Sequence, residues 1–134
     1  MATRYLLDSN ICIYAMKHRP PALLRRLDRS ARACAISVIV YGELWFGRTV
    51  RSHRDAASAN LTALLESIEV LPLPVEAGTH YGTVRAALES RGTPIGMNDT
   101  WIAAHALAES RTLVTNNERE FRRVTGLRVE NWTR

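Results

Sequence analysis

A chain of 134 residues is long enough for one domain with a single hydrophobic core. Its 46% hydrophobic and 23% charged residues exclude an intrinsically disordered chain, and no apolar run approaches the roughly 20 residues that a membrane-spanning helix needs. The net charge of +5 favours an acidic partner, most commonly nucleic acid. The sequence starts without the apolar stretch of a signal peptide, so the expected location is the cytoplasm, with no membrane contact.

Short apolar runs alternate with amphipathic stretches along the chain. The run that ends at Asp8 predicts a buried strand, and Pro72 marks the third strand as an edge or an end. In chain order, the pattern predicts strands at 5–7, 33–37, 69–73, 112–115 and 127–132, and helices at 10–16, 21–29, 38–47, 53–67, 75–90, 100–109 and 118–123. This alternation predicts a single α/β domain over 1–134, with a parallel sheet covered on both faces.

Acidic residues follow several of these elements. Asp8 comes directly after the first strand, Glu43 lies two turns past the second, and Asp99 starts the helix before the fourth. Asn117 and Glu120 follow the fourth strand. In parallel α/β sheets the ligand site lies beyond the carboxyl ends of the strands. If the first and fourth strands are neighbours, these side chains converge at that edge.

Converging carboxylates repel one another, and a bound cation relieves the repulsion. Oxygen ligands without histidine or cysteine favour Mg²⁺ or Mn²⁺. The chemistry expected of such a site is hydrolysis of a phosphodiester by metal-activated water. We therefore take Asp8, Glu43, Asp99 and Glu120 as candidate catalytic residues, with Asp8 and Asp99 as metal ligands.

Each position also has a local explanation. Asp99 or Asn98 would suit the cap of the predicted helix at 100–109, and Glu120 also fits an exposed helical turn. Asn117 would act as a neutral group that positions metal or water, so the fourth position stays open between it and Glu120. Nearby polar residues that would position water or support the carboxylates are Ser9, Thr115 and Asn117. For Ser9 and Asn10, capping of the following helix is the favoured interpretation.

Other chemistries fit less well. Cys12 and Cys34 lie in apolar surroundings and are expected to be buried hydrophobic residues. The four histidines lack the paired spacing of zinc ligands, and His105 is expected to be packed or partly exposed. There is no phosphate-binding glycine loop and no nucleophile elbow.

Four segments together resemble the PIN-domain family, and within it the VapC-type toxins of bacterial toxin–antitoxin pairs. The segments are LLDSNICI (6–13), SV-x-x-YGEL-x-x-G (37–47), PIG-x-x-D-x-x-IA-x-HA (94–106) and LVTNN-x-x-EF (113–121). Each is weak alone, but four in order and at the right separations are specific. Ser9 stands where threonine is common, and Asn117 stands where many relatives have a fourth aspartate.

The resemblance implies a three-layer α/β/α fold with a central parallel sheet of four or five strands. It implies a Mg²⁺- or Mn²⁺-dependent endoribonuclease that acts on structured RNA, such as transfer RNA (initiator transfer RNA among the candidates) or ribosomal RNA. Carried over by motif, Asp8, Glu43 and Asp99 form its metal site. The implied partners are RNA, a VapB-like antitoxin that wraps over the toxin, and a second copy of the chain in a homodimer and larger assembly.

Two other functions are weighed against this one. The same acidic site would serve a structure-specific DNA nuclease or a phosphatase, and a basic α/β domain would bind RNA without catalysis. The single-domain length argues against the first, and the three placed acids argue against the second. Trp45, Phe46 and Trp101 are candidates for a partner surface or for core packing.

Overall fold

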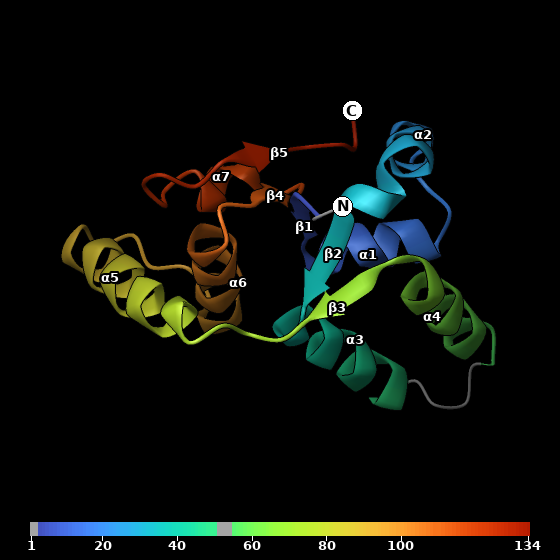
Figure 1. The fold of residues 1–134 in the computed structure, drawn as a ribbon, viewed down its shortest axis with the longest axis horizontal. Helices are drawn as coiled ribbons and strands as arrows, with labels where there is room; N and C mark the ends of the chain where they lie inside the picture. Colours follow the sequence, from blue (N-terminus) through green and yellow to red (C-terminus); the bar gives the residue numbers. More distant parts are fainter. Residues whose placement is uncertain (1–2, 51–54) are drawn as a thin grey trace.

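The computed structural model describes residues 3–50 and 55–134, with the backbone alone for 55–58 (Figure 1). The elements follow one another as β1 (Tyr5–Leu7), α1 (Ser9–Met16), α2 (Pro21–Ser30), a 3₁₀ turn (Ala31–Ala33), β2 (Cys34–Ser37), α3 (Val38–Val50), α4 (Asp55–Ser67), β3 (Glu69–Leu71), α5 (Glu76–Ser90), α6 (Met97–Ala108), β4 (Thr112–Val114), α7 (Glu118–Phe121) and β5 (Val129–Glu130). The predicted helix start at residue 53 lies outside the described residues. None of the described helices is long and apolar enough to cross a bilayer.

All five strands are parallel and lie in the order β3-β2-β1-β4-β5. The central strand β1 pairs with β2 on one side and with β4 on the other. Helices α5 and α6 lie on one side of the sheet, and α1, α2 and α4 lie on the other (Figure 1). The predicted three-layer α/β/α architecture is confirmed, with five strands.

The core is formed by the three inner strands and the helices against them. Every residue of β1, β2 and β4 is buried, as expected for strands covered on both faces. Both edge strands are short, and β3 ends at Leu71 instead of residue 73 because Pro72 has no N–H to donate to a ladder. The proline therefore marks both an edge and an end. The last strand is also shorter than predicted, since only Val129 and Glu130 pair with β4.

The cysteines behave as predicted. Cys12 and Cys34 are free thiols inside the core. Burial raises the pKa of both thiols, that of Cys34 to about 12. Neither thiol ionises at neutral pH, so neither is a reactive nucleophile.

Two helix starts that bear on the acidic residues differ from the prediction. Helix α1 begins at Ser9, with Asp8 as its N-cap, so neither Ser9 nor Asn10 caps it. Helix α6 begins at Met97 with Gly96 at the N-cap, three residues earlier than predicted. Asp99 and Asn98 therefore lie inside the first turn and do not cap the helix. An acidic residue in the first turn is favoured by the helix dipole, but this position also leaves the carboxylate free for other contacts.

Candidate active site

Asp8 lies at the carboxyl end of the central strand and is buried. Its Oδ1 accepts a hydrogen bond from the backbone N–H of Ile11 at 2.9 Å, and its Oδ2 accepts one from the hydroxyl of Thr115. The pairing of Leu7 with Val114 brings the two residues together, since each directly follows its strand. The predicted meeting of the segments after the first and fourth strands is confirmed.

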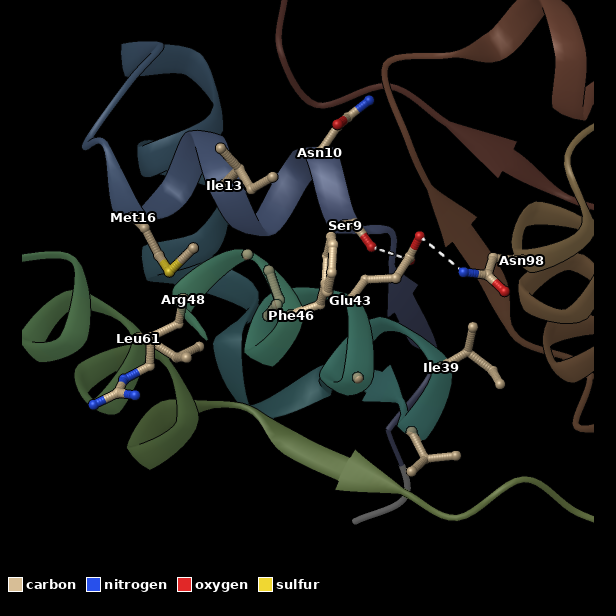
Figure 2. A pocket seen from close by; sticks show the side chains of 14 residues that line it. Ser9, Asn10, Ile13, Met16, Ile39, Glu43, Phe46, Arg48, Leu61 and Asn98 are labelled. Atoms are coloured by element: carbon tan, nitrogen blue, oxygen red, sulfur yellow. Dashed lines mark hydrogen bonds between the residues drawn. The ribbon is translucent and has the colours of Figure 1, made fainter. Parts of the chain in front are cut away.

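Glu43 projects from α3 toward the same edge, and two neutral donors hold its carboxylate. Oε1 accepts from the hydroxyl of Ser9, and Oε2 accepts from the amide nitrogen of Asn98 at 3.3 Å. Figure 2 shows Glu43 between these two side chains, which come from α1 and α6. Ser9 therefore supports Glu43 instead of capping its own helix. The contact between Asn98 and Glu43 was not anticipated, because the motif pointed only to Asp99 beside it.

The pKa values of two carboxyls are raised. Burial raises the pKa of Asp99 to about 6, and the nearby charges of Glu43, Asp8 and Glu120 add to the rise. Burial also raises the pKa of Asp8, to which Glu43 contributes, while the hydrogen bonds from Thr115 and Ile11 work in the opposite direction. The four acidic side chains from four separate elements therefore lie within electrostatic range of one another. Such shifts are typical of functional sites.

Asn117 supports Glu120 at the fourth position. Its side-chain amide donates to Oε2 of Glu120 at 2.8 Å, and its backbone N–H donates to the Thr115 hydroxyl at 2.9 Å. The two residues left open by the sequence are thus hydrogen-bonded to each other. Of this pair, Glu120 is the residue whose charge bears on Asp99.

The donor set fits a hard divalent cation. None of the four carboxylates forms an ion pair with an arginine, lysine or histidine in the described part of the chain. Within that same part, no three His, Cys, Asp or Glu side chains form a ready-made cage for an ion. Mg²⁺ needs no such cage, because it commonly takes one or two carboxylates and keeps several waters. The chemistry of the donors, oxygen only and uncompensated in charge, matches that requirement.

An apolar groove of about 730 Å³ begins at Glu43. It runs between α1 and α3 toward α4, with Ser9, Glu43 and Asn98 at one end and Met16 and Leu61 at the other (Figure 2). Phe46 lines it and is 70% exposed. Of the other two aromatic candidates, Trp45 is 37% exposed. Trp101 stacks on Tyr81 with 4.0 Å between ring centroids and so packs between α5 and α6.

The comparisons with known proteins identify the family. The family model described as "PIN domain" matches residues 5–127. The chain is 39% identical to ribonuclease VapC2 of Rickettsia felis over 96% of this chain and 97% of that protein. It is 36% identical to the tRNA(fMet)-specific endonuclease VapC of Shigella flexneri over 97% of this chain and 98% of that protein.

Solved structures of related chains superpose closely on this one. The crystal structure of VapBC2 from Rickettsia felis, bound to a DNA fragment from their promoter, contains a chain that is 38% identical and superposes with a TM-score of 0.89. That match covers 98% of this chain and 99% of the other. DNA-bound VapBC from Salmonella typhimurium gives a TM-score of 0.85 at 35% identity, covering 97% and 98% of the two chains.

Proposed function

This chain belongs to the PIN-domain family, and on that premise we propose that it is a Mg²⁺-dependent endoribonuclease toxin that cleaves transfer RNA and is inhibited by a VapB-like antitoxin. Mn²⁺ would serve in place of Mg²⁺, since both take oxygen ligands. The substrate and the partner point to the cytoplasm as the place of action.

One observation carries the proposal. Four carboxylates, one on Asp8 after β1 and the others on α3, α6 and α7, lie within electrostatic range of one another, and no basic side chain of the described residues pairs with them. Such an arrangement is unfavourable by itself. It becomes favourable when a divalent cation and a phosphate group occupy the edge.

Asp8 and Asp99 would hold the metal ion, because they are the two acids whose pKa values burial and neighbouring charge raise. When bound, Mg²⁺ lowers the pKa of a coordinated water and neutralises charge on the phosphate. Thr115 fixes one oxygen of Asp8. Ser9 and Asn98 aim Glu43, whose free lone pairs would accept a proton from the attacking water, and Asn117 orients Glu120 in the same way.

The choice of transfer RNA rests on relatives whose names state that substrate. Two of them, from Shigella flexneri and Salmonella typhimurium, are named tRNA(fMet)-specific endonucleases and are 36% and 35% identical over nearly the full length. The net charge of +5 suits a polyanionic substrate. We therefore propose initiator transfer RNA as the first substrate to test.

The test is cleavage of an initiator transfer RNA transcript with Mg²⁺ and with excess chelator. We expect discrete fragments with Mg²⁺ and none with chelator. Cleavage that persists in chelator would overturn the metal dependence. Cleavage of a structured DNA or of a phosphate monoester in preference to RNA would favour the DNA nuclease or the phosphatase. RNA binding without cleavage would favour the non-catalytic domain.

Replacing Glu120 with glutamine tests the fourth position. The substitution keeps the bond from Asn117 but removes the charge, and we expect the cleavage rate to fall by about 10- to 100-fold, as for other groups that support metal ligands. Glu118→Gln is the matched control, because Arg122 and Arg134 already pair with that carboxylate on the same short helix. Equal rates for both variants would remove Glu120 from the site.

We propose that the apolar groove beside Glu43 receives the antitoxin. The groove is open to solvent, and its acidic end would attract a basic side chain of a bound segment. Three of the related chains come from structures of VapBC, and this supports a VapB-like partner. We expect the toxin to be a homodimer within that larger assembly.

Phe46→Asp is expected to weaken antitoxin binding by about 100-fold while leaving RNA cleavage by the free toxin intact. The reason is that an exposed aromatic side chain at the centre of an interface is a typical hot spot, and the loss of a hot spot costs about 2–4 kcal/mol of binding. The measurement is the dissociation constant of the toxin–antitoxin complex. Val75→Asp, at a residue that is 91% exposed and does not line the groove, is the control and should bind like the parent. Unchanged binding by Phe46→Asp would place the antitoxin elsewhere.

A further inference from the structure

A chain of hydrogen bonds starts at two fully buried residues, Ser37 and His105, and has no part in the chemistry proposed above. Ser37 Oγ lies 2.9 Å from Nδ1 of His105, and Nε2 of the same ring lies 3.0 Å from Oε1 of Glu109. That carboxylate pairs with Nε of Arg111 at 2.9 Å, and the guanidinium also donates to the carbonyl and hydroxyl oxygens of Thr3. Both Ser37 and His105 are fully buried.

The contacts determine where the protons sit. The Ser37 oxygen accepts from the backbone N–H of Ile39 at 3.1 Å, so its own hydrogen is available for Nδ1 of His105. The Glu109 carboxylate can only accept, so Nε2 carries the proton of a neutral ring and donates it to Glu109, and Nδ1 accepts from the Ser37 hydroxyl. Burial lowers the pKa of His105, which agrees with a neutral ring. With a neutral ring, the hydrogen bonds from Ser37 to His105 and from His105 to Glu109 therefore have a single direction.

Three members of this chain lie on, or next to, the elements that position the three main acids. Thr3 leads into β1, and Asp8 directly follows that strand. His105 is on α6, whose first turn contains Asp99. Ser37 directly precedes α3, whose second turn contains Glu43. The hydrogen bond between Ser37 and His105 is thus a buried link between the two helices that bring Glu43 and Asp99 together.

We propose that His105, acting through Ser37, is a positioning residue that keeps Glu43 and Asp99 at the separation the metal site needs. Repulsion between the two carboxylates would spread α3 from α6. Among the described residues, the one other side-chain hydrogen bond between these helices is the exposed one from Asn98 to Glu43 at 3.3 Å. A displacement of about 1 Å at a reacting group can reduce a rate by about 100-fold. The proposal rests on the proposed function for its rate effect, but not for its effect on metal binding.

The experiment compares His105→Asn with His105→Gln. The asparagine amide lies where Nδ1 was and keeps the link to Ser37, whereas the glutamine amide reaches the place of Nε2 and keeps only the link to Glu109. Two quantities are measured for each folded variant: the dissociation constant for Mn²⁺ alone, and kcat and KM on the transfer RNA transcript. Ser37→Ala breaks the same link from the other side, and His80→Gln on α5 is the matched control.

We expect His105→Gln and Ser37→Ala to weaken Mn²⁺ binding and to lower kcat by about 10-fold or more, with KM for RNA unchanged. His105→Asn should stay within about threefold of the parent, and the double variant of Ser37→Ala with His105→Gln should lose no more than either alone. A purely structural role predicts equal, small losses for the asparagine and glutamine variants, and that result would overturn the proposal. If the histidine variants do not fold, the positioning role is tested with Ser37→Ala alone, because this substitution deletes only one oxygen. The same two measurements are made on it.

The two proposals can fail separately. A parent that binds Mn²⁺ but does not cleave RNA would overturn the proposed function, while the Mn²⁺ comparison would still decide the role of His105. A parent that binds no Mn²⁺ would overturn both. Parent-like Mn²⁺ binding and cleavage in Ser37→Ala and His105→Gln would overturn only the positioning role.

Discussion

Replacing Asp8 with asparagine is expected to slow RNA cleavage by about 1,000-fold while leaving the protein folded. Removing a metal-binding carboxylate forfeits several kcal/mol of transition-state stabilisation, and about 4 kcal/mol corresponds to three orders of magnitude. Asparagine is as good an N-cap as aspartate, so its side-chain oxygen can still accept from the backbone N–H of Ile11. The measurement is the single-turnover cleavage rate of the transfer RNA transcript at saturating protein.

Asp28→Asn is the matched control for this prediction. Asp28 is exposed on α2, so the same chemical change removes one negative charge outside the carboxylate cluster. We expect parent-like cleavage from this variant. A loss confined to Asp8→Asn would show that the position matters and not the net charge. If both variants cleave at the parent rate, Asp8 is not part of the catalytic site.

The arrangement around Asp8 followed from simple sequence signals. Two short runs, 5–7 and 112–114, are each followed directly by a polar residue, and strands of this kind are buried at the centre of parallel sheets. Polar residues that follow neighbouring parallel strands must meet at one edge. Asp8 and Thr115 do meet there. This part of the site could be predicted because strand order and strand ends determine it.

The rest of the site depends on contacts between residues far apart in the sequence. Asn98 and Glu43 are separated by 55 positions, and His105 and Ser37 by 68, so no local pattern reveals either pair. His105 was expected to be packed or partly exposed. The structure shows that it is fully buried and hydrogen-bonded at both ring nitrogens.

The start of α6 shows how a local preference can mislead. Asn98 and Asp99 are both good capping residues, which favoured a helix from residue 100. The helix instead begins at Met97, because the carbonyl of Gly96 accepts from both the backbone N–H and the hydroxyl of Thr100, each at 2.9 Å. Asp99 thereby turns toward the other acids instead of toward its own backbone. The residue that looked most like a cap is the one whose pKa the cluster raises to about 6.

The metal-free protein is expected to lose stability as the pH rises from about 4 to 6. The carboxyl of Asp99 has its ordinary pKa of 3.8 in the unfolded chain and a pKa of about 6 in the folded one. Between these values the folded state binds more protons than the unfolded state, so the free energy of unfolding falls as the pH rises. Because this side chain is only half-buried, solvent screening reduces the loss to about 1 kcal/mol, or about 3 °C in Tm.

Two other groups bear on the same measurement. The raised pKa of Asp8 acts in the same direction as that of Asp99. The lowered pKa of His105 acts in the opposite direction, because a histidine kept neutral by burial adds stability as the pH rises toward 6.5. The contribution of Asp99 is therefore the difference in the free energy of unfolding between the parent and Asp99→Asn. Both proteins are unfolded with urea, in the presence of chelator, at pH values from 4 to 8.

Asp99→Asn should be the more stable protein at pH 7.5 by about 1 kcal/mol and should show a flatter pH profile, while losing most of its cleavage activity. Adding Mg²⁺ at pH 7.5 should stabilise the parent, by about 1.4 kcal/mol for each tenfold excess of metal over its dissociation constant, and should affect Asp99→Asn much less. If Asp99 supports cleavage but destabilises the metal-free protein, its replacement raises stability and lowers activity. A parent whose stability neither depends on Asp99 nor responds to Mg²⁺ would contradict a metal site at this edge, because nothing would then relieve the repulsion among its carboxylates.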